Sequence, residues 1–198
     1  MLTNWIHVVL LSATLITGAA TAQTDSAAGP RRIAPEGVFR ASALVDSVFV
    51  DRQLSQATVD GGDFAAYLLA RLGARDLPPD FAFTVEVDSA LIRIAGRIAD
   101  LPPEAKQALS QLVLLLPPGT RLEARIELAA AGREAVRFHL RTITVQGVPI
   151  PETFLAPLLA DIGRQYPALT ASGRDLYVQV PAGAKLTLIR GAVLLTGP

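Results

Sequence analysis

The side chains that could perform chemistry are few, because the 198-residue chain has no cysteine and only two histidines. His139 is the one histidine after residue 22, and it stands between Arg137 and Arg141. A general base needs an orienting partner, and two arginines do not provide a carboxylate for that role. We therefore expect His139 to be an exposed strand residue opposite Arg125. A Ser-His-Asp triad would need this same histidine, and the Gly-x-Ser-x-Gly motif is absent.

The acidic residues include two close pairs, Asp76 with Asp80 and Glu86 with Asp88. Glycoside hydrolysis needs two carboxylates across a cleft, and one of them must be buried enough to hold a proton. We expect Glu86 and Asp88 to lie on a solvated strand face instead. The pattern therefore does not favour a hydrolase of this kind.

The stretch Asp60-Gly61-Gly62-Asp63 combines two carboxylates with two glycines. A calcium loop needs alternating oxygen ligands and a final glutamate, which this stretch lacks. We interpret it as a turn from a strand into a helix, with Asp63 as the N-cap residue. A histidine cluster for zinc or iron cannot be built from one histidine. The sequence therefore predicts no enzyme activity, no metal site and no cofactor.

The amino-acid composition further narrows the class of protein to which this chain can belong. The chain has 18 basic and 18 acidic residues, and 51% of its residues are hydrophobic. Nucleic-acid binding needs an excess of basic residues to displace counterions, so no nucleic-acid partner is expected. The apolar content is enough for a sizeable core.

The amino-terminus has the features of an export signal. Residues 5–16 form an apolar run, and Ala20-Thr21-Ala22 matches an A-x-A cleavage pattern. We predict a signal peptide over residues 1–22, a flexible leader over 23–37 and a single domain over 38–198. The run is too short for a spanning helix, so the mature chain is expected to have no membrane span and to be periplasmic or secreted. Because residues 1–22 contain no Lys or Arg, an uncleaved anchor is the alternative.

The elements that would position these residues follow from the hydrophobic pattern. Strict alternation over residues 120–145 predicts an antiparallel hairpin with a loop at Ala131-Gly132-Arg133, in which Ile126 faces Phe138 and Glu127 faces Arg137. A second hairpin is predicted over 81–98 with its turn near Asp88-Ser89. Further strands fit three other ranges, namely 43–51, 174–180 and 185–195.

Three helices separate the predicted strands. The first is capped by Asp63 and carries Phe64, Leu68 and Leu72 at four-residue spacing. The second covers residues 102–116, and the third follows Pro151. Helices separated by hairpins are typical of an α+β fold, here a mainly antiparallel sheet of about seven strands with three helices on its apolar face.

Some segments are more apolar than one buried face requires. Residues 112–116 are apolar all round, the third helix has a double apolar row, and residues 186–195 are apolar on both strand faces. Such elements must be buried on every side, either in the core or against a ligand. Two readings stay open at this point: a fully covered core, or a groove lined by Leu, Val, Ile and Phe that takes a lipid tail.

Several stretches resemble a known group of proteins. They are the strand leading into Asp60-Gly61-Gly62-Asp63-Phe64, the segment 145–151 (VQGVPIP) before a helix, and Tyr166-Pro167 followed by 174–180. Together they resemble small bacterial envelope proteins similar to the tubular lipid-binding (TULIP-like) superfamily. The resemblance implies a strongly curved sheet wrapped on a long helix, a hydrophobic groove for acyl chains and no catalytic residues. That long helix would have to come from the second or the third helical segment.

The leading hypothesis is an exported, non-catalytic protein that binds a lipid or another apolar small molecule. Burial of acyl methylenes at ~0.8 kcal/mol each would supply affinity without any placed polar group. The alternative is a structural or interaction module of the cell envelope, with a solid core and a protein partner. The residues predicted to line a ligand are apolar members of the expected strands and helices: Phe83, Leu112, Leu115, Phe138, Phe154, Leu158 and Ile162.

Overall fold

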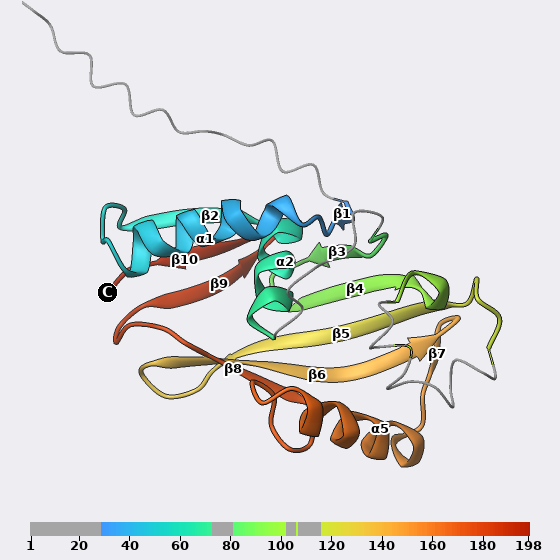
Figure 1. Cartoon of the computed structure of the whole chain (residues 1–198). Coiled ribbons are helices and arrows are strands. Elements are labelled where there is room, and N and C mark those ends of the chain that lie inside the picture. The colour runs from blue at the N-terminus through green and yellow to red at the C-terminus, as the bar shows by residue number, and fades with distance from the viewer. Residues whose placement is uncertain (1–28, 73–80, 102–105, 107–115) are drawn as a thin grey trace, which may run out of the picture.

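The structure is a computed structural model that describes residues 29–72, 81–101, 106 and 116–198 (Figure 1). The described residues form an α+β fold, as the sequence predicts, with a mainly antiparallel sheet of seven strands that does not close into a barrel. A second sheet has three strands. The helices are α1 (Glu36–Phe49), α2 (Gly61–Arg71), the short η1 (Ile98–Asp100) and α5 (Glu152–Gln165).

The larger sheet has the strand order β1-β3-β4-β5-β6-β7, and β8 also pairs with β6. The smaller sheet has the order β2-β10-β9. The bounds of the larger sheet's strands are β1 Arg31–Arg32, β3 Thr84–Val87, β4 Leu91–Arg97, β5 Arg121–Ala130, β6 Ala135–Val145, β7 Val148–Pro149 and β8 Asp175–Gln179. Those of the smaller sheet are β2 Gln56–Asp60, β9 Lys185–Ile189 and β10 Ala192–Thr196.

The β5–β6 hairpin forms where alternation predicts it, but the predicted register is wrong by two residues. Leu128, not Ile126, faces Phe138, and Glu127 faces His139 instead of Arg137. The cause is a longer turn, closed by a hydrogen bond from the Ala131 N–H to the Ala135 carbonyl oxygen. A shift of two preserves the faces, since side chains alternate with period two.

A β-bulge then changes the register again. Arg125 faces Thr142 while Ile126 faces Leu140, so Arg141 has no residue opposite it on β5. The extra residue keeps Leu140 and Ile143 on the same side of the sheet, because their partners Ile126 and Ala124 share that side. One side of the larger sheet is therefore apolar along the whole of β5 and β6.

The β3–β4 hairpin is confirmed at the predicted turn. The Asp88 carboxylate accepts hydrogen bonds from the backbone N–H groups of Ala90 and Leu91, at 2.8 and 2.9 Å. These two bonds hold the pKa of Asp88 below its ordinary value. Glu86 and Asp88 both lie near the guanidinium of Arg93, at 2.9 and 3.7 Å. They form a surface ion-pair cluster, as expected for a solvated strand face.

Two predicted strands are wrong. Residues 43–51 lie mostly in α1, where Ala41 and Val48 are buried at a helical spacing. Residues 185–195 form the antiparallel pair β9 and β10, separated by a turn at Gly191, whose φ is +76°. The two apolar faces noted in the sequence thus belong to two neighbouring strands. Residues before 38 also take part in the fold, since β1 pairs with β3 and Ile33 is fully buried.

The two sheets meet at the start of α2. The Gly61 N–H donates to the Gly191 carbonyl oxygen, and the Gly191 N–H donates to the Val87 carbonyl oxygen at the end of β3. A Cβ at Gly61 would lie 2.8 Å from the Val87 side chain, so only glycine allows this approach. The main hydrophobic cluster extends from this junction across α1, α2 and both sheets.

Candidate apolar pocket

α2 is fixed over the apolar side of the larger sheet by its first turn. The N-cap is Asp60, not Asp63 as predicted, and its side chain accepts a hydrogen bond from the Gly62 N–H. Asp63 instead pairs with Arg40 of α1, whose Nε and Nη2 lie 2.7 and 2.5 Å from its carboxylate oxygens. This bond raises the pKa of Arg40. The polar groups of the first turn are thus satisfied outside the space beneath the helix.

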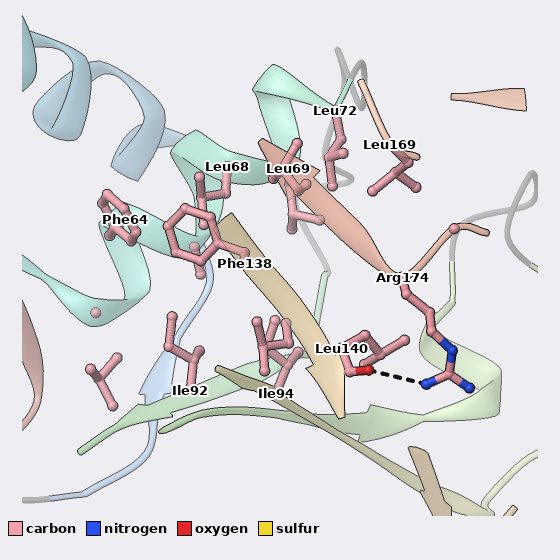
Figure 2. Close-up of a pocket in the computed structure, with 16 residues that line it drawn as sticks. Phe64, Leu68, Leu69, Leu72, Ile92, Ile94, Phe138, Leu140, Leu169 and Arg174 are labelled. Carbon is pink, nitrogen blue, oxygen red and sulfur yellow. Dashed lines mark hydrogen bonds between the residues drawn. The ribbon is translucent and has the colours of Figure 1, made fainter. Parts of the chain in front are cut away.

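A pocket of about 170 Å³ lies between α2 and the apolar side of β4, β5, β6 and β8 (Figure 2). We call it the α2 pocket. Phe64 forms one end, where its ring centroid is 6.0 Å from that of Phe138. The second half of α2 is half-buried at the pocket. The described lining residues are Gly61, Phe64, Ala65, Leu68, Leu69, Leu72, Val87, Ile92, Ile94, Ile126, Phe138, Leu140, Leu169, Gly173, Arg174 and Leu176.

The end of the α2 pocket away from Phe64 contains Arg174, beyond Leu140 in Figure 2. Arg174 is the only charged residue among the sixteen described residues that line the pocket. Its Nη1 donates a hydrogen bond to the Leu140 carbonyl oxygen at 3.3 Å. The pocket is therefore apolar along its length and cationic at one end.

A second cavity of about 150 Å³ lies on the same side of the larger sheet, toward α5. Ile94 of β4 lines both cavities, so they adjoin across one side chain. Phe83 reaches this second cavity by lying against Gly96, where a Cβ would meet its ring at 2.6 Å. The described lining residues are Phe83, Ile94, Leu101, Leu122, Glu123, Ala124, Ile143, Ile150 and Leu158.

A third cavity, between the β5–β6 turn and β9, has a different character. Its volume is about 430 Å³, and its described lining includes Ser89, Arg133, Lys185 and Thr187. Arg133, Lys185 and Thr187 are exposed. The other described lining residues are Ala, Gly, Leu and Val. An apolar ligand gains free energy from the apolar area it removes from water, so the polar side chains make this cavity less suited to it than the α2 pocket.

The seven predicted ligand-lining residues fall in different places. Phe138 lines the α2 pocket, and Phe83 and Leu158 line the second cavity. Ile162 is half-buried and lines none of the three cavities, and Phe154 is 71% exposed. Leu112 and Leu115 lie outside the described residues.

The buried side of α5 explains the exposure of Phe154. The predicted apolar side is centred on Phe154, Leu158 and Ile162 and widened by Leu155 and Leu159. In the structure the two widening residues, Leu155 and Leu159, are the ones buried deepest. Gly163 continues this side and approaches the backbone of residues 170–173 so closely that a Cβ would collide with Thr170. The helix is therefore rotated by about one residue from the predicted orientation.

The α2 side of the pocket is the part that the sequence reasoning missed. Phe64, Leu68 and Leu72 were recognised only as a helix face, and a long cradling helix was expected in a later segment. The signal was present, because residues 64–70 (FAAYLLA) contain no charged residue. A helix that is apolar all round must bury every side or face a ligand.

The charged side of the larger sheet corrects the expectation for His139. Its Nδ1 lies 2.8 Å from the Asp175 carboxylate on β8, and it faces Glu127 instead of Arg125 on β5. Arg137 also approaches Asp175, at 3.7 Å. The histidine thus has a carboxylate partner that the sequence did not reveal. Because these side chains point away from the α2 pocket, they take no part in it.

No group of three or more His, Asp or Glu side chains in the described ranges could hold a metal ion. Within the same ranges, no helix is both long and apolar enough to cross a membrane.

An α+β fold with an apolar pocket beneath one helix is the class that this geometry defines. Comparison with protein-family models, with curated proteins and with solved structures finds no match. The pocket itself is therefore the basis for any proposal about function.

Proposed function

We propose that this protein binds an apolar ligand, such as a lipid chain, in the α2 pocket and does so without catalysis. The observation that carries the proposal is a pocket of about 170 Å³ lined almost entirely by Leu, Ile, Val, Phe and Ala side chains. Engineered apolar cavities of roughly 150 Å³ stay free of water and bind benzene. A pocket of this size suits one ring or a short run of methylenes.

The arrangement of the two adjoining cavities supports a linear ligand. Both lie on the apolar side of the larger sheet, and Ile94 forms part of each lining. A chain that passed Ile94 would remain in contact with apolar side chains on β4 and β5. Each buried methylene would contribute about 0.8 kcal/mol to binding. The proposal places binding in the periplasm or outside the cell, in line with the predicted signal peptide.

The direct test measures binding of 1-octanol to the full chain by isothermal titration calorimetry. Ala65 lines the α2 pocket, so Ala65→Leu adds methyl groups to the space that the ligand would occupy. Ala70→Leu is the matched control on the same helix, outside the described lining. We expect the wild type and Ala70→Leu to bind octanol, and Ala65→Leu to bind about 5- to 150-fold more weakly, since overfilling a site costs roughly 1–3 kcal/mol. Equal binding by both variants would refute the α2 pocket as the site.

The alternative, an interaction module of the cell envelope, rests on two exposed aromatic residues. Phe39 of α1 is 80% exposed and Phe154 of α5 is 71% exposed. Single exposed apolar residues are common on protein surfaces, so they weigh less than a formed pocket. The double variant Phe39→Ser and Phe154→Ser should leave octanol binding unchanged. Loss of octanol binding in that variant, with the fold intact by circular dichroism, would count against the α2 pocket.

A further inference from the structure

The cationic end of the α2 pocket is fixed by β6. Arg174 precedes β8, and its carbonyl oxygen accepts a 2.8 Å hydrogen bond from the Leu140 N–H. Its side chain donates back to the Leu140 carbonyl oxygen, and that side chain is only 19% exposed. If this guanidinium moved into solvent, the side chain would lose its burial and its hydrogen bond to the Leu140 carbonyl oxygen. It is a permanent positive charge beside an apolar space.

The carboxylate that faces Arg174 is held much less firmly. Nη2 of Arg174 lies 2.5 Å from both carboxylate oxygens of Glu152, the first residue of α5. The Glu152 side chain is 66% exposed, whereas that of Arg174 is 19% exposed. Rotation of Glu152 into water costs little, because exposed ion pairs contribute at most about 1 kcal/mol. The positive charge of Arg174 is stabilised by a nearby anion, and the Glu152 carboxylate can rotate away so that another anion takes its place.

We propose that the ligand is a carboxylate with an apolar tail, a fatty acid, whose head group pairs with Arg174. The inference rests on the proposed function, since it adds a head group to the ligand of the same pocket. The tail would point toward Phe64 and Phe138, and the carboxylate would take the place of Glu152 or share the guanidinium with it. A guanidinium has five N–H donors, more than Leu140 and Glu152 use, and it matches a carboxylate in a two-bond geometry.

The experiment compares octanoate with 1-octanol at neutral pH by isothermal titration calorimetry on the full chain. Two variants alter the pair, Arg174→Gln and Glu152→Gln. Arg164→Gln is the matched control, because Arg164 lies on α5, is 68% exposed and lines none of the described cavities. The wild type, Glu152→Gln and Arg164→Gln bind octanol equally if the tail site is intact, because neither Glu152 nor Arg164 lines the α2 pocket.

We expect octanoate to bind the wild type more tightly than octanol does. Arg174→Gln should weaken octanoate about tenfold more than it weakens octanol, since charge-assisted hydrogen bonds are worth roughly 1.5–3 kcal/mol. Glu152→Gln should tighten octanoate about threefold by removing a competing anion whose exposed ion pair is worth roughly 0–1 kcal/mol. Arg164→Gln should change neither affinity.

The outcomes separate the two proposals. If octanol and octanoate bind equally and neither Arg174→Gln nor Glu152→Gln affects octanoate, the head-group inference is wrong and the apolar pocket remains. If the wild type binds neither probe, the proposed function fails and the inference fails with it. Glu152→Gln changes only an exposed side chain, so it provides the answer even if Arg174→Gln does not fold.

Discussion

α2 and α5 both border cavities on the apolar side of the larger sheet, yet they are held in different ways. Phe64 of α2 belongs to the main hydrophobic cluster, and the first turn of α2 is bound by Asp60 and Gly191. α5 buries Leu155 and Leu159 outside that cluster, and it begins at Pro151 without a side-chain cap.

This difference between α2 and α5 separates the apolar residues that are buried in the core from those that border a cavity. The first half of α2 is buried, whereas Leu68, Leu69 and Leu72 in its second half are only half-buried above the pocket. In α5 the exposed Phe154 lies outside the buried side, Leu155 and Leu159 are covered, and Leu158 is half-buried at the second cavity. A ligand would therefore extend the core beneath the second half of α2, whereas α5 would contribute only Leu158.

The largest effect should come from the anchored half of α2. Phe64 is 2% exposed, so Phe64→Ala should lower the free energy of unfolding by roughly 3–5 kcal/mol. Leu69→Ala, at the pocket, should cost only about 1 kcal/mol because Leu69 is half-buried beside an existing space. Urea denaturation measures the free energy of unfolding of both variants. If the two variants lost equal amounts of stability, the two halves of α2 would be packed alike.

The next effect tests how α5 is held. Gly173 has a φ of +67°, and a Cβ there would collide with the Leu159 carbonyl group of α5. Gly173→Ala should therefore cost at least about 2–3 kcal/mol, combining backbone strain with displacement of the helix. The matched control is Gly132→Ala, with a φ of +82° but no atom within 4 Å of its Cβ, which should cost about 1 kcal/mol. Similar values for both would mean that α5 does not depend on this contact.

A smaller effect distinguishes the two helix starts. Asp60→Ala removes the cap of α2 and should cost about 1 kcal/mol in chemical denaturation. Pro151→Ala at the start of α5 removes no side-chain cap and should stay within about 0.5 kcal/mol of the wild type. If Pro151→Ala lowered the free energy of unfolding more than Asp60→Ala, the conclusion that a side-chain cap stabilises α2 but not α5 would be wrong.

The smallest effects concern the ion pairs of the two helices. Arg40→Gln breaks the pair with Asp63 on α2, and Asp161→Asn breaks the pair with Arg164 on α5. Each should cost less than about 1 kcal/mol and less still at high salt, because the arginines are mostly exposed. Thermal unfolding at low and at high ionic strength measures this. A salt-independent loss of several kcal/mol would show that a pair is more buried than its exposure indicates.

The strands that alternate strictly were the predictable part of the fold. The apolar set of β5 and its partner Phe138 were assigned to the correct side, because a register shift of two residues leaves the faces unchanged. The register itself depended on the turn at Ala131–Ala135 and on the bulge at Arg141, which alternation does not encode. The same shift explains why Glu127 was not placed opposite His139, whereas Asp175 reaches His139 through the pairing of β8 with β6.

α1 shows how two sequence signals can disagree. The β-branched Val45, Val48 and Val50 favour a strand, which led to the predicted strand over 43–51. The spacing of Ala41, Val45 and Val48 is helical, and burial follows that spacing. Periodicity was the better guide here, because it reflects the side that tertiary packing covers.

The sequence predicted that an apolar site exists but not which elements line it. Surplus apolar residues indicated a site that could receive a ligand, and Phe138 was named among them. Most of the remaining lining comes from α2, β4 and the segment before β8, which meet only through tertiary contacts. Arg174 could not be distinguished in the sequence from other arginines, because its role depends on the backbone of Leu140.

The junction at Gly191 also has a consequence for the order in which the molecule assembles. Its backbone joins the first turn of α2 to the end of β3, and β10 beside it pairs with β2 from the opposite end of the described chain. During synthesis, α2 has no such anchor until residues 185–196 have left the ribosome. Contacts between segments so distant in sequence form late, so the first turn of α2 lacks its backbone contact with Gly191 for most of the time that the chain is growing.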